Sequence, residues 1–141
     1  MEFPKKRLDR PQGEVRLKAG ITEAHEEVAW QNLSTQIELF TKDQGLYNDT
    51  IKKVNEAFKD KSPTAEAREE ILRTALNFHG RLINELSVAR TLLAVIEGLY
   101  QNPAANSDLK EIDEWLRDTT SGILESAKSQ FVDPNKSQNL H

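Results

Sequence analysis

The fold is decided by a stretch in the first half of the chain, residues 30–58, which reads WQNLSTQIELFTKDQGLYNDTIKKVNEAF. Its large side chains recur at alternating spacings of three and four residues, a period that places them on one face of an α-helix. The period runs through Gly45 and predicts one continuous helix over residues 22–59, with Thr22 as its N-terminal cap. The predicted face consists of Trp30, Leu33, Ile37, Phe40, Gln44, Tyr47, Ile51, Val54 and Phe58.

Two further segments show the same period. Residues 62–100 carry a long apolar face that begins at Leu72 and includes His79. They start with Ser62-Pro63, a pair typical of a helix start because Ser caps and Pro fits the first turn. Residues 107–131 follow a break at Asn102-Pro103, with Ser107 as the predicted cap and Phe131 as the last apolar position. The sequence therefore predicts an all-α fold, an up-down-up bundle of three helices.

The connection between the first two helices is too short for anything but an antiparallel hairpin. In such a coiled-coil-like hairpin, Ile37 lies opposite Leu86 and Gln44 lies opposite His79. At 1.5 Å per residue the two arms are about 57 Å long, whereas the third helix is about 37 Å long. We therefore expect the third helix to cover the open end of the hairpin, and the closed end, residues 40–82, to consist of two helices only.

The closed end carries the candidate interface. A thinly covered apolar stripe of this kind commonly marks a contact surface, through which the hairpin either self-associates into a four-helix arrangement or binds a client protein. Two other interpretations stay open: the N-terminal arm folds back over the stripe, or two helices suffice as a coiled coil. The candidate interface residues are Phe40, Tyr47, Ile51, Val54 and Phe58.

Composition narrows the class of protein. The chain has 141 residues, 37% hydrophobic and 30% charged, which is typical of one soluble domain. It has no Cys, which excludes disulfides, thiolate metal sites and cysteine nucleophiles. No apolar run approaches the roughly 18 residues of a transmembrane segment, and the N-terminus lacks the apolar block of a signal peptide, so we expect a cytoplasmic protein. We expect three regions: an N-terminal arm (1–20), one helical bundle (21–131) and a flexible tail (132–141).

The arm is a second candidate surface. Pro and Gly residues interrupt it, which predicts an extended or flexible segment. Its basic side chains suit the phosphates of nucleic acid or an anionic lipid surface. Asp9 and Glu14 interrupt the basic run, so pairing with an acidic protein surface and a solvated tail stay open as interpretations. The basic residues are Lys5, Lys6, Arg7, Arg10, Arg16 and Lys18.

His79 and Gln44 are polar residues on otherwise apolar faces. We interpret them as a buried polar layer that fixes the register of the hairpin. No H-x-x-x-H, H-E-x-x-H or E-x-x-H pair lies at the ligand spacing of a zinc or di-iron site, and no nucleophile elbow or Gly-rich phosphate loop occurs. The sequence thus predicts neither a metal site, nor a cofactor, nor an enzyme.

Residues 80–93, GRLINELSVARTLL, resemble the helix that follows the phospho-accepting histidine in one class of two-component sensor kinases. In that pattern H-R-x-x-N-x-L leads into a Leu-Leu pair. Here Gly80 stands at the position of the histidine and His79 comes one residue earlier, a displacement of about 100° around the helix. The resemblance covers about a tenth of the chain and implies a histidine phosphotransfer or signalling domain that acts with a partner response regulator.

Two functional hypotheses follow. The leading one is a non-catalytic helical interaction module, such as an adaptor, an assembly or secretion chaperone or a subunit of a complex, which forms a homo-oligomer through the hairpin. The alternative is phosphotransfer through His79. The two differ in one property, because phosphotransfer needs an exposed imidazole and the polar layer buries it.

Overall fold

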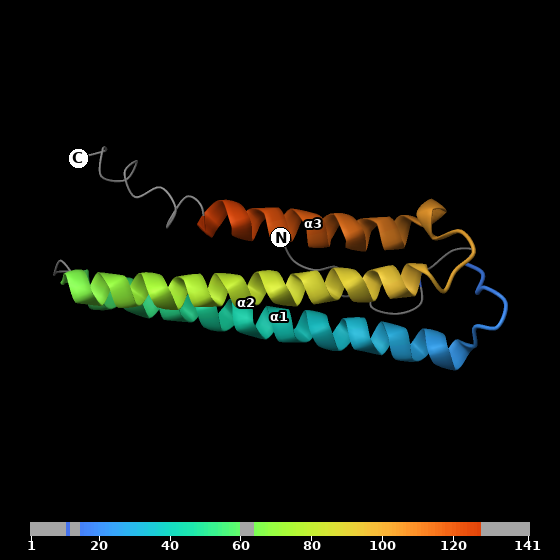
Figure 1. Ribbon diagram of the computed structural model, residues 1–141, viewed down its shortest axis with the longest axis horizontal. Helices are drawn as coiled ribbons and strands as arrows, with labels where there is room; N and C mark the ends of the chain where they lie inside the picture. Colours follow the sequence, from blue (N-terminus) through green and yellow to red (C-terminus); the bar gives the residue numbers. More distant parts are fainter. Residues whose placement is uncertain (1–10, 12–14, 60–63, 128–141) are drawn as a thin grey trace.

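The computed structural model describes residue 11 and residues 15–59 and 64–127 of the chain. Within these residues it forms three α-helices, α1 (Glu23–Ala57), α2 (Ala65–Glu97) and α3 (Ser107–Ala127), with one 3-10 turn, η2 (Pro103–Ala105), before α3. Helices α1 and α2 form an antiparallel hairpin, and α3 runs along it (Figure 1). The predicted all-α fold is confirmed.

The N-terminal ends of the helices are capped by side chains. Thr22 Oγ1 accepts a hydrogen bond from the His25 backbone N–H, and His25 Nδ1 accepts one from the Thr22 N–H. This reciprocal capping box fixes the predicted start of α1. Helix α2 begins later than predicted, because the hydroxyl of Thr64 accepts from the N–H of Ala67. Ser62 and Pro63 lie outside the described residues.

The predicted N-terminal cap of α3 is also wrong. Asn106 Oδ1 accepts hydrogen bonds from the backbone N–H groups of Asp108 and Leu109, at 3.0 and 3.1 Å. Ser107, the predicted cap, is the first residue of the helix instead. Both residue types cap well, and the extended backbone of Asn106 decides between them. The predicted end of α3 at Phe131 lies outside the described residues.

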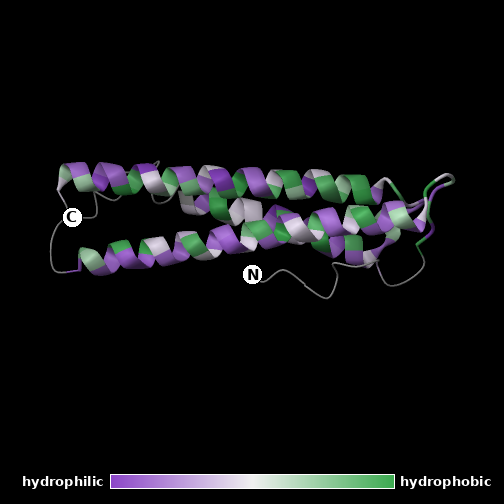
Figure 2. Cartoon of the chain, turned by 90° about the horizontal axis from the view of Figure 1, so that it is seen from below, coloured by the Kyte–Doolittle hydropathy of each residue, from purple (hydrophilic) through white to green (hydrophobic). Residues whose placement is uncertain are grey.

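The core lies in the part of the bundle where all three helices meet. Apolar and polar residues alternate along each helix (Figure 2), and the apolar ones meet between them. Trp115 of α3 packs edge-on against Phe40 of α1, with ring centroids 6.1 Å apart. The fully buried large side chains are Leu33, Phe40, Leu82, Leu86, Leu93, Ile96, Tyr100, Leu109, Ile112 and Leu116.

Helix α3 covers more of the hairpin than the sequence predicts. Gly122, Ile123 and Ser126 of α3 line one hollow together with Tyr47 and His79 of the hairpin. The three-helix part therefore extends past Phe40 and Leu82, which are each 1% exposed. The part lined by α1 and α2 alone is correspondingly shorter than the predicted residues 40–82.

The last part of the predicted arm is fixed to the open end of the bundle. Leu17 and Tyr100 form an antiparallel β-bridge. The Lys18 N–H donates to Leu99 O and the Gln101 N–H donates to Arg16 O, each at 2.8 Å. Residues 15–18 are thus a docked segment at the end opposite the hairpin tip. Gly20 then turns the chain into α1 with φ +85°, a conformation that glycine adopts without strain.

Among the described helices, none is both long enough and apolar enough to cross a membrane.

Candidate functional site

The closed end of the hairpin carries an apolar groove of about 320 Å³ between α1 and α2, which we call the tip groove. Thr50, Glu70 and Thr74 are the polar residues along it. Among the described residues, no α3 residue lines it. Its apolar lining consists of Tyr47, Ile51, Val54 and Phe58 from α1 and Ala67, Ile71, Ala75 and Phe78 from α2.

The groove exists because the apolar face of α1 continues beyond the part that α3 covers. Ile51, Val54 and Phe58 keep the spacing of the buried residues before them but remain half-buried. Aromatic rings close the inner end of the groove, where the Tyr47 ring lies 5.7 Å from that of Phe78 and 4.9 Å from that of His79. At the outer end, around Phe58, no contact between aromatic rings of the described residues closes the groove.

The structure places four of the five candidate interface residues in the tip groove: Tyr47, Ile51, Val54 and Phe58. Phe40 is the exception, and the prediction that it belongs to the interface is wrong. It is 1% exposed because Trp115 packs on it, so it belongs to the core.

The sequence pattern did not predict every α2 residue that lines the groove. The sequence pattern favoured Leu72, which is 41% exposed, whereas Ile71 lines the groove. Ile71, Ala75, Phe78 and Leu82 also follow a spacing of four, three and four residues. The spacing that indicates the groove side of α2 is therefore present in the sequence, one residue away from Leu72.

His79 lies on the inner side of the hairpin and is 5% exposed. Burial lowers the pKa of its imidazole. Gln44 is half-buried, and both residues line a hollow of about 400 Å³ with Asp118 and Thr119 of α3. The ring in contact with His79 is that of Tyr47. This burial does not favour phosphotransfer, which requires an accessible imidazole.

The basic residues of the predicted arm are only partly placed. Arg16 and Lys18 are exposed on the docked segment at the open end. Lys5, Lys6, Arg7 and Arg10 lie outside the described residues.

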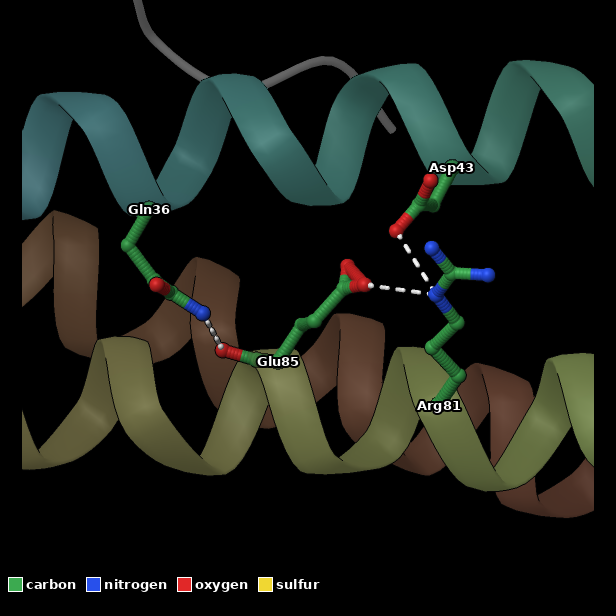
Figure 3. Close-up of polar contacts among 4 residues, drawn as sticks. All are labelled: Gln36, Asp43, Arg81 and Glu85. Atoms are coloured by element: carbon green, nitrogen blue, oxygen red, sulfur yellow. Dashed lines mark hydrogen bonds and ion pairs between the residues drawn. The ribbon is translucent and has the colours of Figure 1, made fainter.

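A buried acidic pair, which no sequence motif indicates, crosses the hairpin between Asp43 of α1 and Glu85 of α2 (Figure 3). Their side chains are 3% and 7% exposed. Arg81 Nε lies 3.2 Å from Asp43 Oδ2 and 3.6 Å from Glu85 Oε1. Gln36 Nε2 donates a hydrogen bond to the backbone oxygen of Glu85 at 3.0 Å, which joins α1 and α2 beside the pair.

Burial is the main cause that raises the pKa of Glu85, to about 7. The side-chain hydrogen bond with Asp43 and the negative charge of Asp43 raise this pKa further, and the positive charge of Arg81 lowers it. The spacing of four residues between Arg81 and Glu85 is the one trace of the pair in the sequence.

Nothing matches. Comparisons with protein-family models, with curated proteins and with solved structures found no counterpart of this chain. In the part of the chain that the structure describes, no three His, Asp or Glu side chains gather as ligands for a metal ion. The proposal for function therefore depends on the tip groove.

Proposed function

We propose that the chain is a non-catalytic helical protein–protein interaction module, of the kind used as an adaptor, an assembly or secretion chaperone or a subunit of a complex, and that it self-associates through the tip groove. The observation that carries the proposal is the groove itself. Its walls are mostly apolar, and half-buried aromatic and aliphatic side chains extend along both helices. Water against such a surface is unfavourable, and a second apolar surface that displaces it stabilises the contact by about 25 cal/mol per Å².

A second copy of the chain is the partner that we assign to the groove. A second hairpin, packed antiparallel on the first, completes a four-helix arrangement at the closed end. In a two-fold contact of this kind, α1 of one copy lies along α1 of the other, and α2 lies along α2. The apolar residues at the same level, Ile51 of α1 and Ile71 of α2, then lie at the centre of the contact.

Replacing Ile51 with Glu is expected to weaken self-association at least about tenfold, because a carboxylate at the centre of an apolar contact loses its hydration. We expect the wild-type chain to sediment with twice its mass of 16.0 kDa and the Ile51→Glu variant to shift toward the single mass. Sedimentation velocity over a concentration series measures both states, and circular dichroism verifies that the helices remain folded.

Leu46→Glu is the matched control. Leu46 lies on α1 one residue before Tyr47, is 47% exposed and does not line the groove. This variant should keep the wild-type mass. A wild-type chain that stays monomeric at high micromolar concentration, or equal effects of the two substitutions, would contradict the proposal.

A further inference from the structure

Two buried acids, one on α1 and one on α2, face one another across the hairpin. In Figure 3 the carboxyl groups of Asp43 and Glu85 both point toward Arg81, with α3 behind them. Arg81 is the one cation in contact with the pair among the described residues, and its side chain is 61% exposed. Two buried carboxyls thus share one partly solvated positive charge.

Full ionisation of this pair is unfavourable for two reasons. First, two negative charges in a poorly hydrated space repel each other more strongly than in water, and only part of this repulsion is offset by an exposed guanidinium. Second, among the described residues no group donates a hydrogen bond to the buried oxygens Asp43 Oδ2 and Glu85 Oε2, and the contact of Arg81 with Asp43 Oδ2 is an ion pair without hydrogen-bond geometry. One proton on the pair removes a negative charge and supplies the missing donor.

We propose that Asp43 and Glu85 share one proton, and that release of this proton is a pH-sensitive switch that loosens the hairpin. With the proton bound, a carboxyl–carboxylate hydrogen bond joins α1 to α2. Without it, two like charges push the helices apart at a point one turn from Tyr47, where the tip groove begins. The charged groups that act on Glu85 are Asp43 from α1 and Arg81 from its own helix.

The direction of the pH dependence follows from the two states of Glu85. Its pKa is about 7 in the folded protein and 4.5 as an ordinary glutamate. The folded state therefore binds the proton more tightly than the unfolded state. The stabilising contribution is complete below pH 4.5 and is lost as the pH rises through 7. Between pH 5 and pH 9 the folding equilibrium constant should fall by about 80-fold from this group.

Two other groups titrate in or near the same range and must be separated from Glu85. Burial lowers the pKa of His79, so its contribution is lost as the pH falls, which is the opposite direction. Burial and the charge of Asp113 raise the pKa of Glu97, which acts in the same direction as Glu85. The test therefore compares the pH dependence of the folding constant in wild type with that in a Glu85→Gln variant. His79 and Glu97 are present in both chains, so their contributions cancel in the ratio.

The test is denaturant unfolding of the full chain from pH 5 to pH 9 in wild type, Glu85→Gln and Glu38→Gln, whose Glu38 is exposed on α1. We expect the ratio of folding constants, wild type over Glu85→Gln, to fall by about 80-fold over this range. Glu38→Gln should follow the wild-type profile. Parallel profiles for wild type and Glu85→Gln would overturn the proposal.

Carbon-detected NMR of the side-chain carboxyls provides a direct measurement that does not depend on the folding of any variant. The Glu85 carboxyl carbon in the wild-type chain should titrate with a midpoint near 7. In Asp43→Asn, which removes the neighbouring negative charge, the midpoint should move down. A Glu85 midpoint near 4.5 in the folded wild-type chain would also overturn the proposal.

Discussion

Replacing Trp115 with Ala is expected to lower the free energy of unfolding by about 3 to 5 kcal/mol, the range for loss of a large aromatic side chain from a packed core. Trp115 is 6% exposed and lies between α3 and the hairpin, with its ring at 84° to that of Phe40. Its loss removes a contact by which α3 covers α1. Denaturant unfolding followed by circular dichroism measures the change.

The matched control for Trp115 lies on the same helix. Leu124 of α3 is 53% exposed, and Leu124→Ala should change the free energy of unfolding by less than about 0.5 kcal/mol. In Trp115→Ala the ring of Phe40 should also become accessible. If the two substitutions cost the same, the position assigned to α3 over Phe40 is wrong.

Replacing Tyr100 with Phe is expected to lower the free energy of unfolding by about 2 to 4 kcal/mol, although it removes a single oxygen atom. The Tyr100 hydroxyl is buried, donates to Glu26 Oε2 at 2.6 Å and accepts from Trp30 Nε1 at 2.9 Å. The bond to the carboxyl of Glu26 has the short length of a charge-assisted hydrogen bond, which is stronger than a neutral one. The substitution removes both bonds and keeps the ring. Urea unfolding at pH 7 provides the measurement.

A double-mutant cycle separates the hydrogen bonds of Tyr100 from the packing of its ring. Tyr100→Phe, Glu26→Gln and the double variant should give a coupling energy of about 1 kcal/mol or more, because the two side chains belong to one network. Additive effects of the two single substitutions would show that this network does not hold the open end of the hairpin together.

The long helices and their pairing were predictable because the information is local. A period of three and four residues defines the buried face of a helix, and a short connection leaves one way to pair two such faces. The contacts from Gln36 to Glu85 and from Tyr47 to His79 lie within a turn of the predicted register.

The extent of each buried face was not predictable from the same pattern. Phe40 and Ile51 occupy equivalent positions on one face, and the period says nothing about what covers each of them. Whether α3 covers a residue of the hairpin depends on where α3 begins and how far it extends. The Asn106 cap fixes where it begins. Phe40 is therefore in the core, whereas Ile51 lines the tip groove.

Contacts made by the backbone or by isolated polar residues were also not predictable from the sequence pattern. Residues 15–18 dock through backbone hydrogen bonds to residues 99–101, and such bonds leave no pattern in the side chains. Asp43 and Glu85 lie on different helices, and as single acids among many exposed ones they are distinguished only by their burial. The acidic pair can be identified only from the structure, in which the two helices lie side by side.

The central claim is that two copies meet at the tip groove, and the absence of Cys makes a direct test simple, since one introduced Cys carries one spin label. Labels at Asn55→Cys, at the tip, and at Asn102→Cys, at the open end, occupy exposed positions. Double electron–electron resonance then measures the distance between the labels of two copies. We predict distances below about 30 Å at Asn55 and none below about 60 Å at Asn102, given helices of about 50 Å that point away from each other. Short distances at Asn102 with none at Asn55, or no distance at either position, would contradict the account.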